Sequence, residues 1–269
     1  MIGIILIQLR KALYFIFFCI DSLFNRKSEK VVFCYHAISD SGWRYSTKNE
    51  TFTKQIDLLV KNGYKHVSLA EIFTYKGKCF HLTFDDGYRS LLSVRDFLKS
   101  LNIKPSFFVL SASSEYDLQG LGVDIKKYEH FLTTEETRLL ISDGWVLGSH
   151  TNTHKLLKDL SKEVLKKEIT GSKEQLESRF GINVEALSYP RGVYNDSVIA
   201  LAKDSGYTYG LTMDDEKLDE SKKLQIPRIG IDNTHSVNEI LWTSSPTSIE
   251  FRKFVKDNLF SIVLKGLTK

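Results

Sequence analysis

From Val31 onward, the sequence alternates short apolar runs, rich in β-branched and aromatic residues, with longer segments of helical periodicity. The apolar runs lie at 31–36, 80–84, 105–111, 145–150, 184–190 and 207–213. Segments of helical period separate them, at 52–62, 88–101, 133–144, 161–180 and 196–205. This repetition predicts βα units that form a parallel sheet with helices outside it. With 269 residues, 42% of them hydrophobic, the chain can bury the core of one large α/β domain or of two small ones.

Polar side chains stand where several of the predicted strands end. His36 closes the first strand, Asp85 and Asp86 close the second, His150 closes the strand before the long helix, and "YPRG" at 189–192 follows the strand at 184–190. Parallel α/β sheets, open or closed into a barrel, build their sites at the carboxyl ends of the strands. We therefore expect these four clusters to form a single site.

Two of these clusters together predict a metal centre. Adjacent carboxylates such as Asp85 and Asp86 repel each other unless a proton or a cation lies beside them. His150 and His154, four positions apart, can direct both imidazoles at one ion. Two histidines and one of the aspartates would make a three-ligand site with an open position, while the other aspartate stays free to accept a proton. We expect one divalent ion, with Zn²⁺ favoured and Co²⁺ or Ni²⁺ as alternatives.

These residues resemble the NodB-type polysaccharide deacetylases, carbohydrate esterase family 4. The first family motif, T-F-D-D-G, is present as Thr83 to Gly87, and the second, H-[ST]-x-x-H, as His150 to His154, both without substitution. "CYH" at 34–36 and "YPRGVYND" at 189–196 resemble the branch with an N-terminal Y-H motif and a Y-P-x-G third motif. The resemblance covers about 31–230 and implies a distorted (β/α) barrel of about seven parallel strands.

The resemblance also implies roles for individual residues. Asp85 would be the general base, and Asp86, His150 and His154 would be the metal ligands. The backbone N–H of Arg191, after the third-motif proline, would stabilise the oxyanion, with Tyr189 and Pro190 binding substrate. Apart from the resemblance, Tyr128 in the long segment 112–132 is a candidate to stack on a sugar face, although aromatic residues that anchor such a loop on the barrel are at least as common.

Two departures from the family pattern affect these roles. The family often has an arginine two residues before the third-motif proline to orient the base, whereas this chain has Ser188 there, and Arg191 is a candidate replacement. The late leucine-x-histidine motif, whose histidine protonates the leaving amine, has no clear match after residue 214. His235 and the strand-end His36 are the two candidates for that general acid.

The expected function is removal of an N-acetyl group from amino-sugar residues of a polysaccharide or a lipid-linked saccharide. A deformylase or O-acetyl esterase with the same site, and a catalytically silent carbohydrate-binding protein, are the alternatives. The net charge of +4 comes from Lys and Arg residues scattered among acids, so we do not expect a nucleic-acid partner. Cys19, Cys34 and Cys79 are widely spaced, which favours neither a disulfide framework nor a thiolate metal site.

The termini differ in character from this central region, and we divide the chain into segments 1–30, 31–235 and 236–269. The first is apolar and aromatic with basic residues, but its run from Ala12 to Ile20 is shorter than the roughly 20 residues of a membrane span. We expect this first segment to form an interfacial helix that makes peripheral contact with a membrane, on a side that the sequence does not specify. The alternative structure is a helix packed on the domain. The alternative locations are secreted and cytoplasmic. The last segment is predicted to be an amphipathic, basic helix that packs on the domain or joins the membrane surface.

Overall fold

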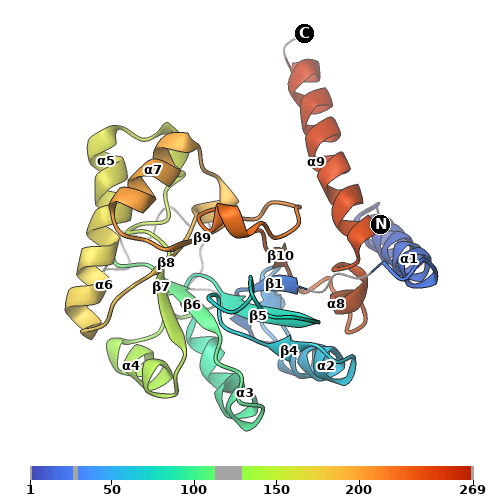
Figure 1. Ribbon diagram of the computed structural model, residues 1–269, viewed down its shortest axis with the longest axis horizontal. Coiled ribbons are helices and arrows are strands. Elements are labelled where there is room, and N and C mark those ends of the chain that lie inside the picture. The colour runs from blue at the N-terminus through green and yellow to red at the C-terminus, as the bar shows by residue number, and fades with distance from the viewer. Residues whose placement is uncertain (1, 27–29, 113–128, 268–269) are drawn as a thin grey trace.

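The computed structural model describes residues 2–26, 30–112 and 129–267, with side chains described as far as Asn258. Its main sheet is parallel throughout, in the order β10-β1-β5-β6-β7-β8-β9, and β4 pairs with the start of β5 (Figure 1). The strands of this sheet are β1 (Lys30–Tyr35), β4 (Lys65–His66), β5 (Cys79–Phe84), β6 (Ser106–Val109), β7 (Val146–Ser149), β8 (Ala186–Ser188), β9 (Tyr209–Leu211) and β10 (Ile229–Gly230). Two short strands, β2 (Ala37–Ile38) and β3 (Ser46–Thr47), form a separate pair.

Helices cover the outer face of the sheet. They are α2 (Asn49–Lys61), α3 (Arg95–Ser100), α4 (Thr134–Ser142), α5 (Lys162–Lys166), α6 (Ser172–Phe180) and α7 (Asp196–Asp204). Three more, α1 (Ile2–Leu23), α8 (Glu239–Trp242) and α9 (Pro246–Leu267), gather beside the β10–β1 edge (Figure 1). The pattern predicts one helix over 161–180, but a π-helical turn at Lys167–Gly171 separates α5 from α6.

The segment 226–230 joins the two edges of the sheet. Ile226 forms a parallel bridge with Leu211 at the end of β9, and three residues later Ile229 pairs with Phe33 of β1. The last short strand therefore turns the sheet back on its first strand, which gives the distorted barrel of about seven parallel strands expected from the sequence.

The paired strands β1 and β5 are buried over almost their whole length. All six residues of β5 and five of the six in β1 are buried, because the barrel interior lies on one side and helices lie on the other. Such strands are near-continuous apolar runs and do not alternate in polarity. In β7, which pairs with β6, Gly148 leaves room for the Phe108 ring, since an added Cβ would lie 2.3 Å from Phe108 Cε1. Close packing inside the barrel thus holds the strand ends in register.

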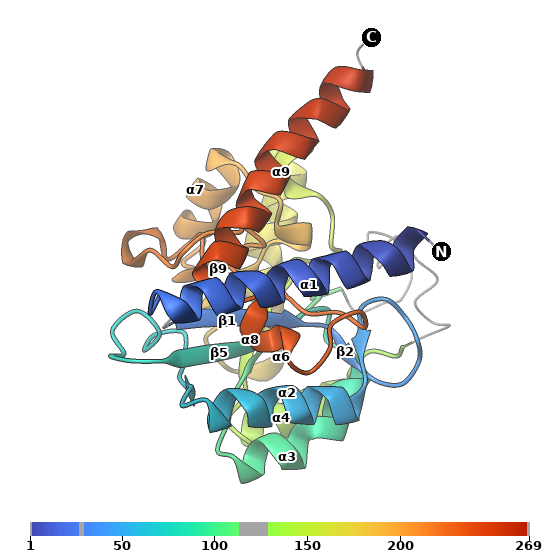
Figure 2. The ribbon, with the colours of Figure 1, turned by 90° about the vertical axis from the view of Figure 1, so that its right-hand side faces the viewer.

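Helix α1 lies on the outside of the domain against α8 and α9 (Figure 2). The Phe15 ring lies 5.1 Å from that of Trp242, and the Phe17 ring lies 5.2 Å from that of Phe251. By length and composition, the stretch Gly3–Leu23 is sufficient to cross a membrane, with a mean hydropathy of 1.8. The expectation that the segment is too short was therefore wrong on length, because apolar residues continue on both sides of Arg10 and Lys11.

Candidate metal centre and active site

The polar strand-end residues meet at one end of the barrel. His36 follows β1, Asp85 and Asp86 follow β5, and His150 follows β7. The next strand, β8, contributes Ser188, whose hydroxyl donates to Asp85 Oδ2 at 3.0 Å. These residues therefore lie at the carboxyl ends of four strands of one parallel sheet, with β6 between β5 and β7.

Asp86, His150 and His154 form a buried group with the donor set of a metal site. One carboxylate oxygen and one nitrogen from each imidazole lie within 4.8 Å of one another. Asp86 Oδ1 lies 3.3 Å from His150 Nε2 and 3.7 Å from His154 Nε2. Among the described residues, Asp86 Oδ1 is buried without a hydrogen-bond partner, a costly state for a carboxylate oxygen. A divalent cation would satisfy it, so these residues fit the expected ion.

The backbone around these ligands is strained. Asp86, Thr151 and His154 have φ angles of 68°, 69° and 60°, in the left-handed region that residues with a side chain seldom occupy. Each such residue costs of order 1 kcal/mol or more and persists only where the surroundings enforce it. Here the conformation directs two of the three candidate ligands at one point.

Glu168 holds the loop between the two histidines. It is 2% exposed, and its carboxylate accepts hydrogen bonds from the backbone N–H groups of Asn152 and Thr153 and from the Thr153 hydroxyl. Glu168 lies within the π-helical turn, which changes the direction of side chains relative to a regular helix. The π-helical turn therefore places the Glu168 carboxylate against the loop that carries His154.

A backbone contact fixes the orientation of His150. Its Nδ1 lies 2.8 Å from the carbonyl oxygen of Ser188, which can only accept, so Nδ1 carries the proton. Nε2 is then left as the nitrogen that faces Asp86. Such a contact is typical of metal-binding histidines, where it fixes the tautomer and the ring plane.

Arg228 forms a two-point ion pair with Asp85. Its two terminal nitrogens donate to the two carboxylate oxygens, each at 2.7 Å, and the guanidinium also donates to Ser188 Oγ at 2.8 Å. The Arg228 side chain is fully buried. Burial alone would raise the pKa of Asp85, but the charge and hydrogen bonds of Arg228, together with the nearby His150 and His36, outweigh it and hold the pKa well below its usual range. Asp85 is therefore ionised at neutral pH.

Arg228 was not predicted for this role, for which Arg191 was the candidate. Arg191 has an exposed side chain and a φ of 57° in the short turn after β8, so the arginine that contacts Asp85 is Arg228. One sequence signal was available: Arg228 interrupts the apolar run "IPRIGI" at 226–231. An arginine that is buried within an apolar run almost always needs an acidic partner.

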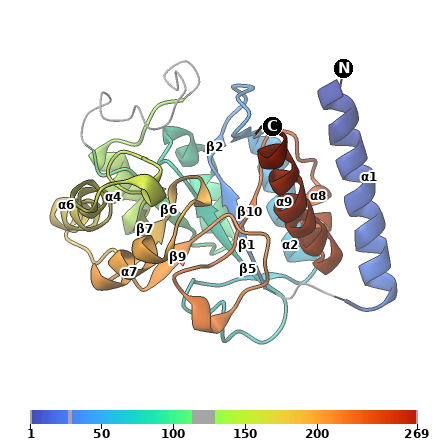
Figure 3. The ribbon, with the colours of Figure 1, turned by 90° about the horizontal axis from the view of Figure 1, so that it is seen from above.

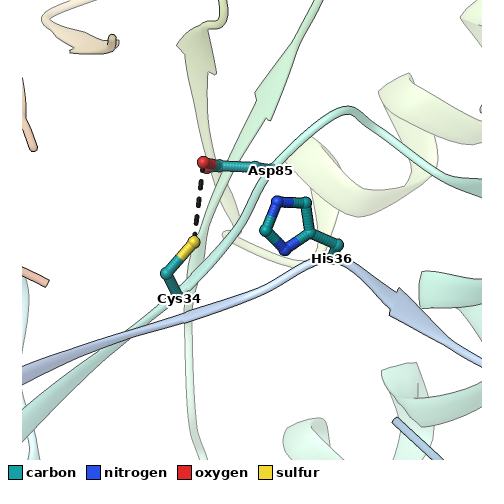
Figure 4. A group of neighbouring side chains, drawn as sticks. All are labelled: Cys34, His36 and Asp85. Atoms are coloured by element: carbon teal, nitrogen blue, oxygen red, sulfur yellow. Dashed lines mark hydrogen bonds between the residues drawn. The ribbon is translucent and has the colours of Figure 1, made fainter. Parts of the chain in front are cut away.

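His36 and Cys34 lie on the β1 side of Asp85 (Figure 4). Cys34 Sγ contacts Asp85 Oδ2 at 3.5 Å, and one ring nitrogen of His36 lies within 4.8 Å of the ligand atoms of both residues. Within the described part of the chain, the buried His36 Nδ1 has no hydrogen-bond partner. A cation is not expected at this second group, because Arg228 already neutralises Asp85. His36 thus lies beside Asp85 with a buried ring nitrogen.

His235 lies in a different environment. Its Nδ1 is 2.8 Å from Asp232 Oδ1, and the ring lines a 280 Å³ pocket with Ser39, Thr47 and Asn233. The groups that lower the pKa of Asp85 and Asp86 include His36 and His150 but not His235. The structure therefore brings His36, and not His235, next to the metal-site residues.

The third-motif residues are mostly internal. The Tyr189 side chain is fully buried, donates from its hydroxyl to the Leu224 carbonyl at 3.0 Å and stacks on Tyr194. Pro190 is buried in the turn that follows. The Tyr189 ring is therefore packed inside the protein, and its substrate-binding role stays a prediction. Tyr128 lies outside the described residues.

A pocket of about 580 Å³ opens beside Asp86. Its lining includes Arg89, His130, Phe131 and Arg179. The Phe131 ring stacks on Tyr88 at 5.4 Å, and the Tyr88 hydroxyl donates to Asp86 Oδ2 at 2.9 Å. Phe131 therefore anchors its segment against a residue that also supports a candidate metal ligand.

Comparison with known proteins gives a consistent result. The chain is 28% identical over 189 residues to the putative polysaccharide deacetylase YxkH of Bacillus subtilis, a match that covers 67% of this chain and 63% of that relative, slightly less than two thirds of its length. It is also 28% identical over 206 residues to the poly-beta-1,6-N-acetyl-D-glucosamine N-deacetylase of Staphylococcus epidermidis, covering 70% of this chain and 69% of the relative.

Solved structures share the fold. The Streptococcus pyogenes deacetylase PplD in complex with acetate aligns with a TM-score of 0.68 at 24% identity, over 82% of this chain and 100% of that one. IcaB from Ammonifex degensii aligns with the same TM-score at 19% identity, over 82% and 99% of the two chains. The family model described as polysaccharide deacetylase matches residues 74–210, just over half of the 269 residues. The chain therefore belongs to the polysaccharide deacetylase family.

Proposed function

We propose that this chain is a metal-dependent hydrolase that removes N-acetyl groups from amino-sugar residues of a polysaccharide or a lipid-linked saccharide. The observation that carries the proposal is the buried Asp86, His150 and His154 group next to a carboxylate that Arg228 fixes at both oxygens. The relative from Staphylococcus epidermidis is a deacetylase of poly-beta-1,6-N-acetyl-D-glucosamine, which makes a β-1,6-linked N-acetylglucosamine chain the first substrate to test.

Asp86, His150 and His154 would hold the ion, and their two nitrogens and one oxygen favour Zn²⁺, with Co²⁺ or Ni²⁺ as alternatives. When bound, a divalent ion there would polarise the acyl oxygen and acidify the attacking water. The protein's own contribution is to orient the ligands, through the Ser188 carbonyl at His150 and the Tyr88 hydroxyl at Asp86. We also propose that the backbone N–H of Arg191 stabilises the oxyanion.

Asp85 is proposed as the general base. Arg228 keeps it ionised, and the same contact fixes its plane, so the carboxylate is held in one orientation before substrate arrives. Cys34 and Ser188 both contact Oδ2, whereas in the described part of the chain Oδ1 accepts a hydrogen bond from Arg228 alone. Oδ1 therefore retains the capacity to accept the proton of a water molecule.

His36 is proposed as the general acid, in preference to His235. Its place beside Asp85 and Asp86 supports this role, and so does a buried Nδ1 without a partner among the described residues. The amine that leaves when an amide is cleaved needs a proton, and histidine is the side chain that most often supplies one as a general acid.

Replacing His36 with glutamine is expected to lower turnover by about a hundredfold or more, the usual size of a lost general acid. His235→Gln is the matched control and is expected to change turnover by less than about threefold. Steady-state rates on an acetylated oligosaccharide, together with metal content for both variants, provide the measurement. If His235→Gln showed the large loss and His36→Gln did not, the acid would be assigned to His235.

The purified protein is expected to hold about one divalent ion per chain and to release acetate from β-1,6-linked N-acetylglucosamine oligomers. Removing the ion with a chelator should abolish this release, and adding Zn²⁺ should restore it. Elemental analysis and an acetate assay test both statements, with His150→Ala and His154→Ala as variants that should lose ion and activity together. Acetate release from an O-acetylated sugar without any from the N-acetyl substrate would point to an esterase. A bound ion without turnover of any acylated sugar would point to a binding protein.

A membrane-surface location is also proposed for this activity. The support is the long apolar helix α1. Only 6% of its most apolar window is buried in the protein, although a signal sequence has the same general character. Polysaccharide chains that emerge from a membrane, and lipid-linked saccharides, would both be within reach of an enzyme held there.

A further inference from the structure

Helix α1 holds charged as well as aromatic residues against the domain and leaves a large part of its apolar surface exposed. Arg10 donates to Glu239 Oε1 at 2.9 Å and to Thr234 Oγ1 at 3.0 Å. The Glu239 side chain is fully buried, so the positive charge of Arg10 neutralises a carboxylate that water does not reach. A helix on a water-soluble surface normally turns its apolar stripe toward the core.

A second polar contact ties the other half of α1 to α9. Asp21, 1% exposed, accepts hydrogen bonds from the backbone N–H of Thr247 at 2.8 Å and from its hydroxyl at 2.6 Å. Between the two contacts, Tyr14 is buried, and the Arg252 guanidinium lies 5.7 Å from its ring centre. Arg10 and Asp21 are about 16 Å apart along the helix axis, so α1 is held flat against the domain at two points.

The opposite side of α1 is an exposed apolar stripe. We define the outer stripe as Ile5, Leu9, Ile16, Ile20 and Leu23, with exposed fractions of 53%, 53%, 50%, 38% and 82%. Their spacing of three, four or seven residues places them on one side of a helix. A continuous apolar surface of this kind normally marks a contact with lipid or protein.

We propose that α1 lies in the plane of a lipid bilayer, with the outer stripe in the acyl boundary and Arg10 and Asp21 on the domain side. A transmembrane orientation would require Arg10 and Asp21 to leave their partners, and Glu239 would remain buried without its counter-charge. The mean hydropathy of 1.8 in the most apolar 18-residue window of Gly3–Leu23 favours hydrocarbon over a second protein copy, because protein interfaces carry a polar rim. The 43% exposed Arg26 and the net charge of +4 suit anionic headgroups.

This arrangement sets the direction in which the active site opens. Helix α1 runs antiparallel to β1, and its N-terminus lies at the end of the barrel that β1 and β2 share with the site (Figures 2 and 3). The segment that Arg10 contacts also reaches this end of the barrel. Thr234 accepts a hydrogen bond from Arg10, and the backbone N–H of the preceding residue, Asn233, donates to the carbonyl of Arg44, which lies between β2 and β3. The barrel axis would then lie parallel to the membrane, with the site opening along its surface. This last step rests on the proposed function, whereas the in-plane helix does not.

The double substitution Ile16→Glu and Ile20→Glu tests the outer stripe. The full chain is expected to bind vesicles of phosphatidylcholine with about one-third phosphatidylglycerol, and the variant to bind at least about tenfold more weakly, because two charges would enter the acyl boundary. Val60→Glu with Leu139→Glu is the matched control, since these apolar residues are 44% and 42% exposed on α2 and α4. It should bind as the unmodified chain does. Deacetylation of a soluble oligosaccharide should be equal in all three proteins, so a failure to bind lipid would not count against the proposed function.

Depth measurements separate an in-plane helix from a spanning one. Single spin labels at Ile5→Cys, Ile16→Cys and Leu23→Cys, in a Cys19→Ser background, should report similar depths near the headgroups. A spanning helix would separate the first and last labels by about 27 Å, and that result would overturn the proposal. The proposal would also fail if the chain bound no vesicles but sedimented as a dimer that Ile16→Glu with Ile20→Glu dissociates, because the stripe would then bind a second copy.

Discussion

Replacing Asp85 with asparagine is expected to lower turnover by about a thousandfold or more while metal affinity stays within a few-fold. An amide cannot accept the proton of the attacking water, so the loss falls in the range of a missing general base. No ligand is removed, because Asp86, His150 and His154 carry the proposed site. Turnover rates and metal titration on the same preparation provide the measurement.

The matched variant is Asp86→Asn, which should lose metal affinity as well as rate. A neutral amide is a poorer ligand for a divalent cation than a carboxylate. The two substitutions are isosteric and adjacent, so they separate base from ligand with little difference in packing. If Asp85→Asn lost the metal and Asp86→Asn kept it, the two roles would be exchanged. Activity in both variants would contradict the proposed mechanism.

Stability must be measured alongside these rates. Asp85→Asn leaves the buried Arg228 without its counter-charge, and breaking a buried ion pair in this way typically costs about 3–5 kcal/mol. A thermal melt with metal bound shows whether the variant is folded at the assay temperature. An inactive but folded and metal-loaded Asp85→Asn protein is the result that supports the assignment.

The barrel and the strand-end residues could be predicted from the sequence because they depend on local patterns. Apolar runs between helical segments indicate βα units, and such units place Asp85, Asp86 and His150 at one end of the barrel. The spacing of His150 and His154 is also local, and the structure brings both next to Asp86.

Arg228 could not be placed from local patterns, because its partner Asp85 lies 143 positions away. The two residues meet only because the segment 226–230 returns to β1 and closes the barrel. Periodicity also does not predict a π-helical turn such as the one that carries Glu168. The orientation of α1 could not be predicted for a related reason. In the sequence, Arg10 and Asp21 look like solvent-exposed charges, because their partners Glu239 and Thr247 come from the distant helices α8 and α9.

Replacing Arg228 with methionine is expected to destabilise the fold by about 3–5 kcal/mol and to reduce turnover by about a hundredfold or more. The stability loss arises because the buried Asp85 carboxylate loses its charged partner. The rate loss arises because a carboxylate without its two-point contact no longer holds one orientation. Arg228→Lys keeps the charge but not the planar fork, so it should recover much of the stability and less of the rate.

A double-substitution cycle distinguishes a positioning role for Arg228 from a merely structural one. If Arg228 acts through Asp85, combining Arg228→Met with Asp85→Asn should cost less stability than the sum of the single changes, by about 1–3 kcal/mol. The rate of the double variant should equal that of Asp85→Asn alone, because no base remains to be oriented. Arg95→Met is the control, since Arg95 is a partly exposed arginine paired with Asp143 away from the site, and it should leave turnover unchanged. Additive stability losses, or a further fall in rate in the double variant, would show that Arg228 acts on the site by a route other than Asp85.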